Sequence, residues 1–309
     1  SGGRGGDGGS GASGGRWGGS SGGDRSSGGR AGGRPGTGRG GDRPGADRRG
    51  GGPRSGSDRG PRGAASRGPD DGGDRSRTAP GPSSAPRVPD PIVDEDVTGR
   101  ELDEEIRSEL SALSGQMAAA VSRHLVMAQR LLDEDPQLAY EHAMAARRKA
   151  GRIGVVREAA GVAAYVAGKY ADALSELRAA RRMTGSAEYL PMMADAERGL
   201  GRPRRALDLS HDPAVTGLDT AGRIEMLIVA AGARRDLGDH EAAAVSLQVP
   251  ELRSKARAEW VARLRYAYAD ALLAAGRETE ARRWFLRAAE ADIDDETDAA
   301  ERAAELGED

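Results

Sequence analysis

Apolar residues recur every three or four positions through most of residues 99–306, and this spacing predicts amphipathic helices rather than strands. At the start of this region Leu102, Ile106, Leu110 and Leu113 follow one another at spacings of four, four and three, which places them on one face of a helix. The same reading predicts paired helices at 117–133 with 137–149, 153–167 with 170–184, 187–199 with 203–210, 220–236 with 239–247 and 256–275 with 278–291, and a last helix near 295–306. The fold class expected is therefore all-α.

A glycine followed by an alanine five positions later recurs along these helices, at Gly168/Ala173, Gly201/Ala206, Gly238/Ala243 and Gly276/Ala281. The alanines are 33, 37 and 38 residues apart, a period typical of stacked helical hairpins. Glycine tolerates the positive φ that often ends a helix, and alanine lets two helices approach closely. We therefore expect a hairpin turn at each of these glycines.

Two of the hairpins carry further residues at the spacing of a known repeat. They are Gly161, Gly168, Tyr170, Ala173, Leu177 and Ala180 in the second hairpin, and Tyr268, Ala269, Leu272, Gly276, Ala281, Phe285 and Ala288 in the fifth. With them, residues 117–291 resemble the tetratricopeptide repeat (TPR), a helical hairpin of about 34 residues. The resemblance implies a right-handed α-solenoid of about five hairpins, with capping segments at 91–116 and 292–309.

The chain departs from the TPR pattern in several places. Arg157 and Arg265 stand where the family often has tryptophan, and Asp135-Pro136 replaces the first turn glycine. Pro213 and Pro250 come early in the third and fourth second helices, which must therefore be short. We expect an irregular middle to the repeat array.

The segment before the first hairpin admits two interpretations. Thr98 is a candidate cap for the first helix, and Gly115 either ends that helix or bends it. The apolar stripe of residues 99–134 then either packs on the first hairpin, the interpretation that we favour, or joins two copies of the chain as a homo-oligomer.

Residues 1–90 differ in composition from the rest of the chain. They hold 32 of the 47 glycines and carry 16 Arg against 9 Asp, a net charge of +7, whereas residues 91–309 carry a net charge of −10. A segment with so little apolar surface cannot offset the entropy cost of ordering, so a long disordered tail is expected.

The tail contains Arg-Gly runs that resemble the RGG segments of RNA-binding proteins. The arginines in or near such runs are Arg4, Arg30, Arg39, Arg48 and Arg49. Arginine neutralises phosphate and stacks on bases, but Trp17 is the only aromatic residue in the tail and nine aspartates dilute its charge. We favour a solvated linker, and weak binding of RNA is the alternative.

Residues that would support catalysis are sparse. The chain has no cysteine, and its histidines, His124, His142, His211 and His240, lie in separate predicted helices without metal-ligand spacing. Ser210-His211-Asp212 is read as a turn, because the members of a catalytic triad converge in space and are seldom adjacent in sequence. We expect no enzyme activity, cofactor, metal or membrane span, and a cytoplasmic location. The excess of Arg, Gly and Ala over Lys and Asn suggests a GC-rich bacterial genome of the actinobacterial type.

The TPR resemblance also implies where a partner would bind. In that family the first helix of each hairpin lines a concave groove, and the matching positions are Glu158, Val162, Tyr165, Asp195, Arg198, Arg235, Tyr266 and Asp270. Arginine and tyrosine are good anchors for a peptide. The function expected is therefore a non-catalytic scaffold or adaptor that binds another protein.

Overall fold

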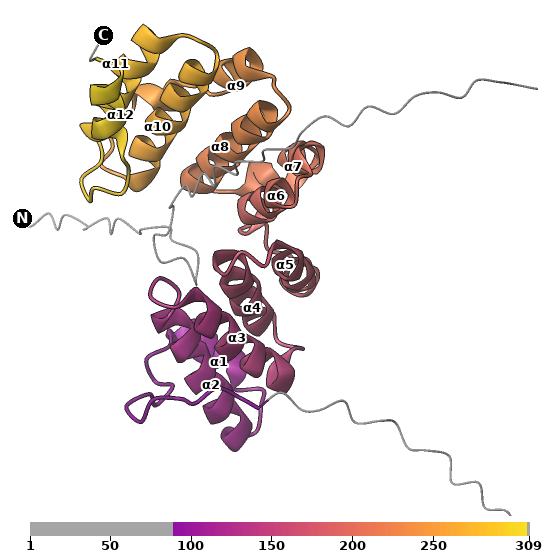
Figure 1. The fold of residues 1–309 in the computed structure, drawn as a ribbon. Coiled ribbons are helices and arrows are strands. Elements are labelled where there is room, and N and C mark those ends of the chain that lie inside the picture. Colours follow the sequence, from indigo (N-terminus) through magenta and orange to yellow (C-terminus); the bar gives the residue numbers. More distant parts are fainter. Residues whose placement is uncertain (1–88, 308–309) are drawn as a thin grey trace, which may run out of the picture. The chain divides into compact units, whose positions relative to one another are not determined.

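The computed structural model describes residues 89–307, and all regular structure within that range is helical (Figure 1). The α-helices are α1 (Glu104–Leu110), α2 (Gly115–Arg130), α3 (Pro136–Ala150), α4 (Gly154–Val166), α5 (Tyr170–Thr184), α6 (Leu190–Gly199), α7 (Pro203–Ser210), α8 (Thr220–Asp236), α9 (His240–Ser246), α10 (Glu259–Ala274), α11 (Glu278–Ala289) and α12 (Ala299–Glu305). Two short 3-10 helices, η1 (Pro213–Gly217) and η2 (Pro250–Arg253), follow α7 and α9. The all-α expectation is confirmed for the described residues.

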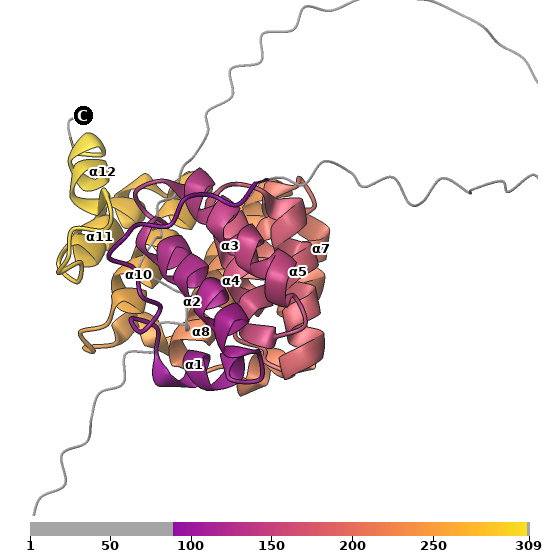
Figure 2. The same ribbon diagram turned by 90° about the horizontal axis from the view of Figure 1, so that it is seen from below.

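Each helix packs mainly on its neighbours in the sequence. The predicted hairpins correspond to α2 with α3, α4 with α5, α6 with α7, α8 with α9 and α10 with α11, and the two helices of each pair are in contact. Contacts also join α6 to α8 and α8 to α10, so the first helices of successive hairpins touch one another. This order of neighbours can be followed in Figures 1 and 2.

The turns of four hairpins are made by glycine, as the Gly/Ala pattern predicts. Gly168, Gly201, Gly238 and Gly276 have φ of 71°, 69°, 83° and 74°, a left-handed conformation that other residues adopt only with strain. The alanine that follows each turn glycine is fully buried between helices. In the first hairpin Asp135 caps α3 instead, where its side chain accepts a hydrogen bond from the Leu138 amide at 3.0 Å.

Proline shortens the second helices of the third and fourth hairpins, as expected. Helix α7 has eight residues and gives way to η1 at Pro213, and α9 has seven residues and gives way to η2 at Pro250. The missing N–H of proline and its clash with the preceding turn account for both endings.

The two arginines that stand at the tryptophan positions of the TPR pattern join separate elements. Arg265 on α10 donates to the carbonyls of Leu252, Ser254 and Arg287, at 3.3, 2.8 and 3.0 Å. Arg157 on α4 donates to the Gly151 carbonyl at 2.7 Å. At both positions a guanidinium therefore donates hydrogen bonds to carbonyls outside its own helix.

The first helix differs in detail from the prediction. Thr98 does not cap it, because its amide and hydroxyl donate to the Glu101 carboxylate and the helix begins later, after Asp103. Helix α1 ends at Leu110, and a separate helix, α2, begins at Gly115. Ile106 and Leu110 are buried in one cluster with Val121, so these residues of the stripe pack within the chain.

Of the predicted tail, only Pro89 and Asp90 belong to the described part of the chain. The RNA-contact candidates Arg4, Arg30, Arg39, Arg48 and Arg49 lie outside the described residues.

Candidate functional site

Side chains of α4, α6 and α8 are joined in a chain of hydrogen bonds that we call the α4–α8 network. The Tyr165 hydroxyl donates to the Asp195 carboxylate at 2.6 Å. Arg198 donates to the other oxygen of Asp195 at 2.7 Å and to Asp236 at 2.8 and 3.3 Å. One guanidinium therefore bridges two carboxylates that belong to different helices.

A second chain of contacts, the α8–α12 network, continues from the neighbouring residue of α8. Arg235 forms an ion pair with Asp270 of α10. Arg302 of α12 donates to the other Asp270 oxygen at 3.2 Å and to the Tyr266 hydroxyl at 3.1 Å. Since Arg235 and Asp236 are adjacent, the two networks meet at the last turn of α8.

The sequence separations of these contacts show why they form. Tyr165 and Asp195 are 30 residues apart, Arg198 and Asp236 are 38 apart, and Arg235 and Asp270 are 35 apart. These separations are close to one repeat length. Each contact therefore joins corresponding positions on the first helices of two successive hairpins. The repeated arrangement of helices thus brings side chains of opposite charge, or a tyrosine and a carboxylate, next to each other.

Partial burial strengthens both networks. Burial alone would lower the pKa of Arg198, but its bonds to Asp236 and Asp195 raise that pKa above its ordinary value. Burial, together with the Asp195 carboxylate, raises the pKa of the Tyr165 hydroxyl, which stays protonated and keeps donating. Burial likewise raises the pKa of Tyr266. These side chains are therefore held in fixed protonation states near neutral pH.

A further ion pair lies between α8 and α10. Arg263 donates to both oxygens of Glu225, at 2.8 and 2.7 Å, in the two-pronged geometry that suits a guanidinium and a carboxylate. Burial would lower the pKa of Arg263, and Glu225 raises it.

The predicted partner residues are brought together except for two. Tyr165, Asp195, Arg198, Arg235, Tyr266 and Asp270 all belong to the two networks. Val162 is buried among the helices, and Glu158 is 3 % exposed. Helix α4 is covered by neighbours at most of its positions, which keeps Glu158 away from solvent.

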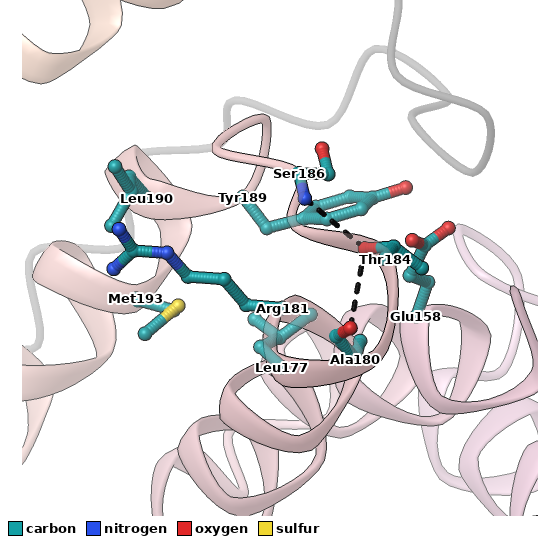
Figure 3. Close-up of a pocket in the computed structure, with 9 residues that line it drawn as sticks. All are labelled: Glu158, Leu177, Ala180, Arg181, Thr184, Ser186, Tyr189, Leu190 and Met193. Atoms are coloured by element: carbon teal, nitrogen blue, oxygen red, sulfur yellow. Dashed lines mark hydrogen bonds between the residues drawn. The ribbon is translucent and has the colours of Figure 1, made fainter. Parts of the chain in front are cut away.

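Glu158 lines a crevice between α4, α5 and the start of α6, shown in Figure 3. In the crevice the Thr184 hydroxyl donates to the Ala180 carbonyl and accepts from the Ser186 amide, both at 3.2 Å. The crevice leaves essentially no room for even a water molecule, so it is far smaller than a typical small-molecule site.

Metal ligation and the Ser-His-Asp run can be checked in the described residues. No group of three or more His, Cys, Asp or Glu side chains among them is placed to hold a metal ion. Asp212 of the Ser-His-Asp run pairs with Arg181 at 2.9 and 3.0 Å and accepts from the Ala214 amide at the start of η1. It therefore has a structural role at a turn, as the sequence indicated.

Sequence reasoning missed several members of the networks. Asp236 and Arg302 of the networks, and Arg263 of the separate pair with Glu225, were not singled out, although each lies about one repeat length from a partner, at 38, 32 and 38 residues. A search for opposite charges at that separation would have found them.

Two general comparisons bear on this chain. No protein-family model matches it, and no curated protein matches it either. Of the described helices, none combines the length and the apolar character needed to cross a membrane.

Proposed function

We propose that this chain is a non-catalytic cytoplasmic adaptor with a TPR-like solenoid, and that it holds a peptide or helix of another protein on the surface formed by the two networks. The observation that carries the proposal is the alignment of tyrosine, aspartate and arginine side chains along α4, α6, α8, α10 and α12. TPR likeness itself rests on the hairpins, the turn glycines and the buried alanines described above.

The chemistry of the networks suits recognition of a peptide. Arginine and tyrosine are enriched among residues that contribute strongly to protein interfaces. Their mutual hydrogen bonds fix them before a partner arrives, which lowers the entropy cost of binding. Arg198 and Arg302 stay 28 % and 26 % exposed, so both remain within reach of a partner. Because arginines and aspartates alternate along the two networks, we expect the partner segment to carry both acidic and basic residues.

The test must change the surface without leaving a charge unpaired. An exchange of Arg198→Asp with Asp236→Arg, combined with Asp195→Asn, keeps an ion pair between α6 and α8 while it reverses the pattern that a partner meets. The Asp195→Asn change removes a carboxylate that would otherwise lose its Arg198 partner and face a second carboxylate. A matched control exchanges the exposed pair Arg130 and Asp96, which lie 2.8 Å apart on a different part of the chain. Affinity capture with each full-length variant, quantified by mass spectrometry, compares the proteins retained.

The adaptor function is supported if one protein is retained in equal amounts by the wild type and the control exchange, and in an amount at least tenfold lower by the Arg198/Asp236 exchange. If all three forms retain the same proteins in the same amounts, the networks are not the partner surface. Thermal unfolding of the three forms verifies that each is folded.

The alternative function is RNA association through the Arg/Gly-rich tail. Its support is the net charge of +7 in residues 1–90, because arginine–phosphate contacts release counterions and favour nucleic acid. Replacing Arg4, Arg30, Arg39, Arg48 and Arg49 by serine in the full chain is expected to abolish crosslinking to RNA. Retained crosslinking would exclude these arginines as the contact.

A further inference from the structure

Five cationic side chains surround the junction between α3 and α4. They are Arg147, Arg148, Lys149, Arg152 and Arg157, and we call them the α3–α4 cation cluster. All five line an open depression of about 680 Å³ that also touches Leu113. This volume lies within the range of small-molecule sites.

The acidic side chains nearby do not balance this charge. Glu176 pairs with Arg147 at 3.0 Å and with Arg157 at 2.5 Å. Asp90 pairs with Arg148 at 2.6 Å and also with Lys149. Two carboxylates thus face five cations.

Arg152 is the clearest source of the excess positive charge. Its side chain is exposed and forms no ion pair within the described residues. Glu109 of α1 accepts a hydrogen bond from the Val155 amide, at the start of α4, at 3.4 Å, and counting its charge as well still leaves two positive charges over.

A purely structural explanation covers only part of the cluster. Cations at the C-terminus of α3 offset the helix dipole, which is equivalent to about half a negative charge. Arg157 already serves that end of the helix through its bond to the Gly151 carbonyl. Within the described part of the chain, the carboxylates that pair with these five cations do not match the remaining excess.

We propose that the α3–α4 cation cluster is a binding site for an anion that carries two or more phosphate groups. Guanidinium groups match phosphate oxygens in paired hydrogen bonds, and four of the five cations are arginines. The excess positive charge exceeds what one carboxylate can satisfy, which favours an oligophosphate. This proposal concerns residues of α3, of α4 and of the turn between them, all outside the two networks, so it stands or falls separately from the adaptor function.

Asp90 occupies part of this site as an internal anion. Its hydrogen bonds to Lys149 and Arg148 hold the pKa of its carboxyl at about 2, so it is ionised at neutral pH. An incoming phosphate would compete with Asp90 for the same two cations. Removing the charge of Asp90 should therefore strengthen binding, whereas removing cations should weaken it.

Isothermal titration of the full chain with sodium tripolyphosphate at low salt tests the proposal. We expect the double variant Arg148→Gln, Arg152→Gln to bind at least about tenfold more weakly, given the usual strength of charge-assisted hydrogen bonds. Asp90→Asn should bind several-fold more tightly. The control Arg182→Gln removes one exposed charge from the last turn of α5 and should bind as the wild type does.

A second titration, with single-stranded oligouridine, distinguishes the source of the phosphate. If both titrations respond to the cluster variants, the site takes the nucleic acid backbone, and if only tripolyphosphate does, it takes a free oligophosphate. Three results would overturn the proposal: no binding of tripolyphosphate by the wild type, equal affinity of the cluster and control variants, or weaker binding by Asp90→Asn. Matching thermal unfolding midpoints verify that every variant is folded.

Discussion

At the residue scale, the close contact between α4 and α5 depends on a glycine, which has no side chain. Gly161 lies where α4 meets α5, and a Cβ atom added there would come within 2.5 Å of the Leu177 side chain and 3.2 Å of its backbone nitrogen. Gly115, in contrast, has open space around it. The same residue type thus has opposite roles at two positions of the chain.

Gly161→Ala is expected to destabilise the protein by about 1–3 kcal/mol, because the added methyl group overpacks the α4–α5 contact. Gly115→Ala is the matched control and should be neutral or slightly stabilising, since it only reduces the freedom of the unfolded chain. Urea unfolding of both variants measures the difference. Equal effects on stability would contradict the role given to Gly161.

A buried histidine pair gives the fold a dependence on pH. The Nδ1 atoms of His124 and His142 lie 3.0 Å apart between α2 and α3, and the two side chains are 5 % and 0 % exposed. Burial, then the neighbouring His142, lowers the pKa of His124 to about 4, and burial lowers that of His142 as well. Both rings are therefore neutral in the folded protein near neutral pH.

Because these pKa values are lower in the folded state, the unfolded chain binds more protons between pH 6.5 and 4. The free energy of unfolding should therefore fall as the pH falls through that window, by about 2–3 kcal/mol. Urea unfolding at several pH values measures the slope. The double variant His124→Leu, His142→Leu should flatten it, whereas His240→Gln, at an exposed site, should not. A slope unchanged in the double variant would assign the effect to other groups.

At the element scale, one arginine of α10 joins several segments of the chain. Arg265 satisfies carbonyls of η2, of the loop after it and of α11, so one side chain fixes three segments. Two of its acceptors lie in η2 and just after it, in the non-helical stretch that follows the shortened α9.

Arg265→Met should cost about 1–3 kcal/mol of stability, because the replacement keeps most of the side-chain length but leaves carbonyls without their donor. Arg283→Met serves as control, since Arg283 is exposed on α11 and should tolerate the change. Thermal unfolding compares the two variants. A midpoint for Arg265→Met equal to that of the control would show that water replaces the guanidinium without loss.

At the scale of the whole described chain, contacts run mainly between neighbouring helices. Proteins built in this way gain stability from each unit and its interfaces, and one end can open while the other stays folded. Phe285 is fully buried near the C-terminal end, in the cluster formed by α8 to α12.

Phe285→Ala should remove about 3–5 kcal/mol from this end. Amide hydrogen exchange is expected to show lost protection in α10–α12 and retained protection in α2–α4. Uniform loss in all helices would show a single cooperative unit and would argue against the solenoid that we propose. Leu125→Ala, in the cluster formed by α1 to α4, is the reciprocal variant and should affect the other end.

The sequence by itself determined the helices and their turns. Helical periodicity, the steric freedom of Gly168 or Gly276 and the missing N–H of Pro213 act within a few residues, so they can be read locally. Most helix boundaries differ from the prediction by no more than three residues for that reason. The pattern also placed Tyr165, Arg198 and Asp270 on first helices.

Only the tertiary structure decided which of these side chains meet. Arg198 pairs with Asp236 across 38 residues, and Arg148 with Asp90 across 58, because packing sets the distance between their helices. It also buried Glu158, since α4 is enclosed by neighbours that its own sequence does not reveal. Local sterics determine where helices end and the chain turns. The pairing of charges depends on distances between helices, which are set only when the helices pack.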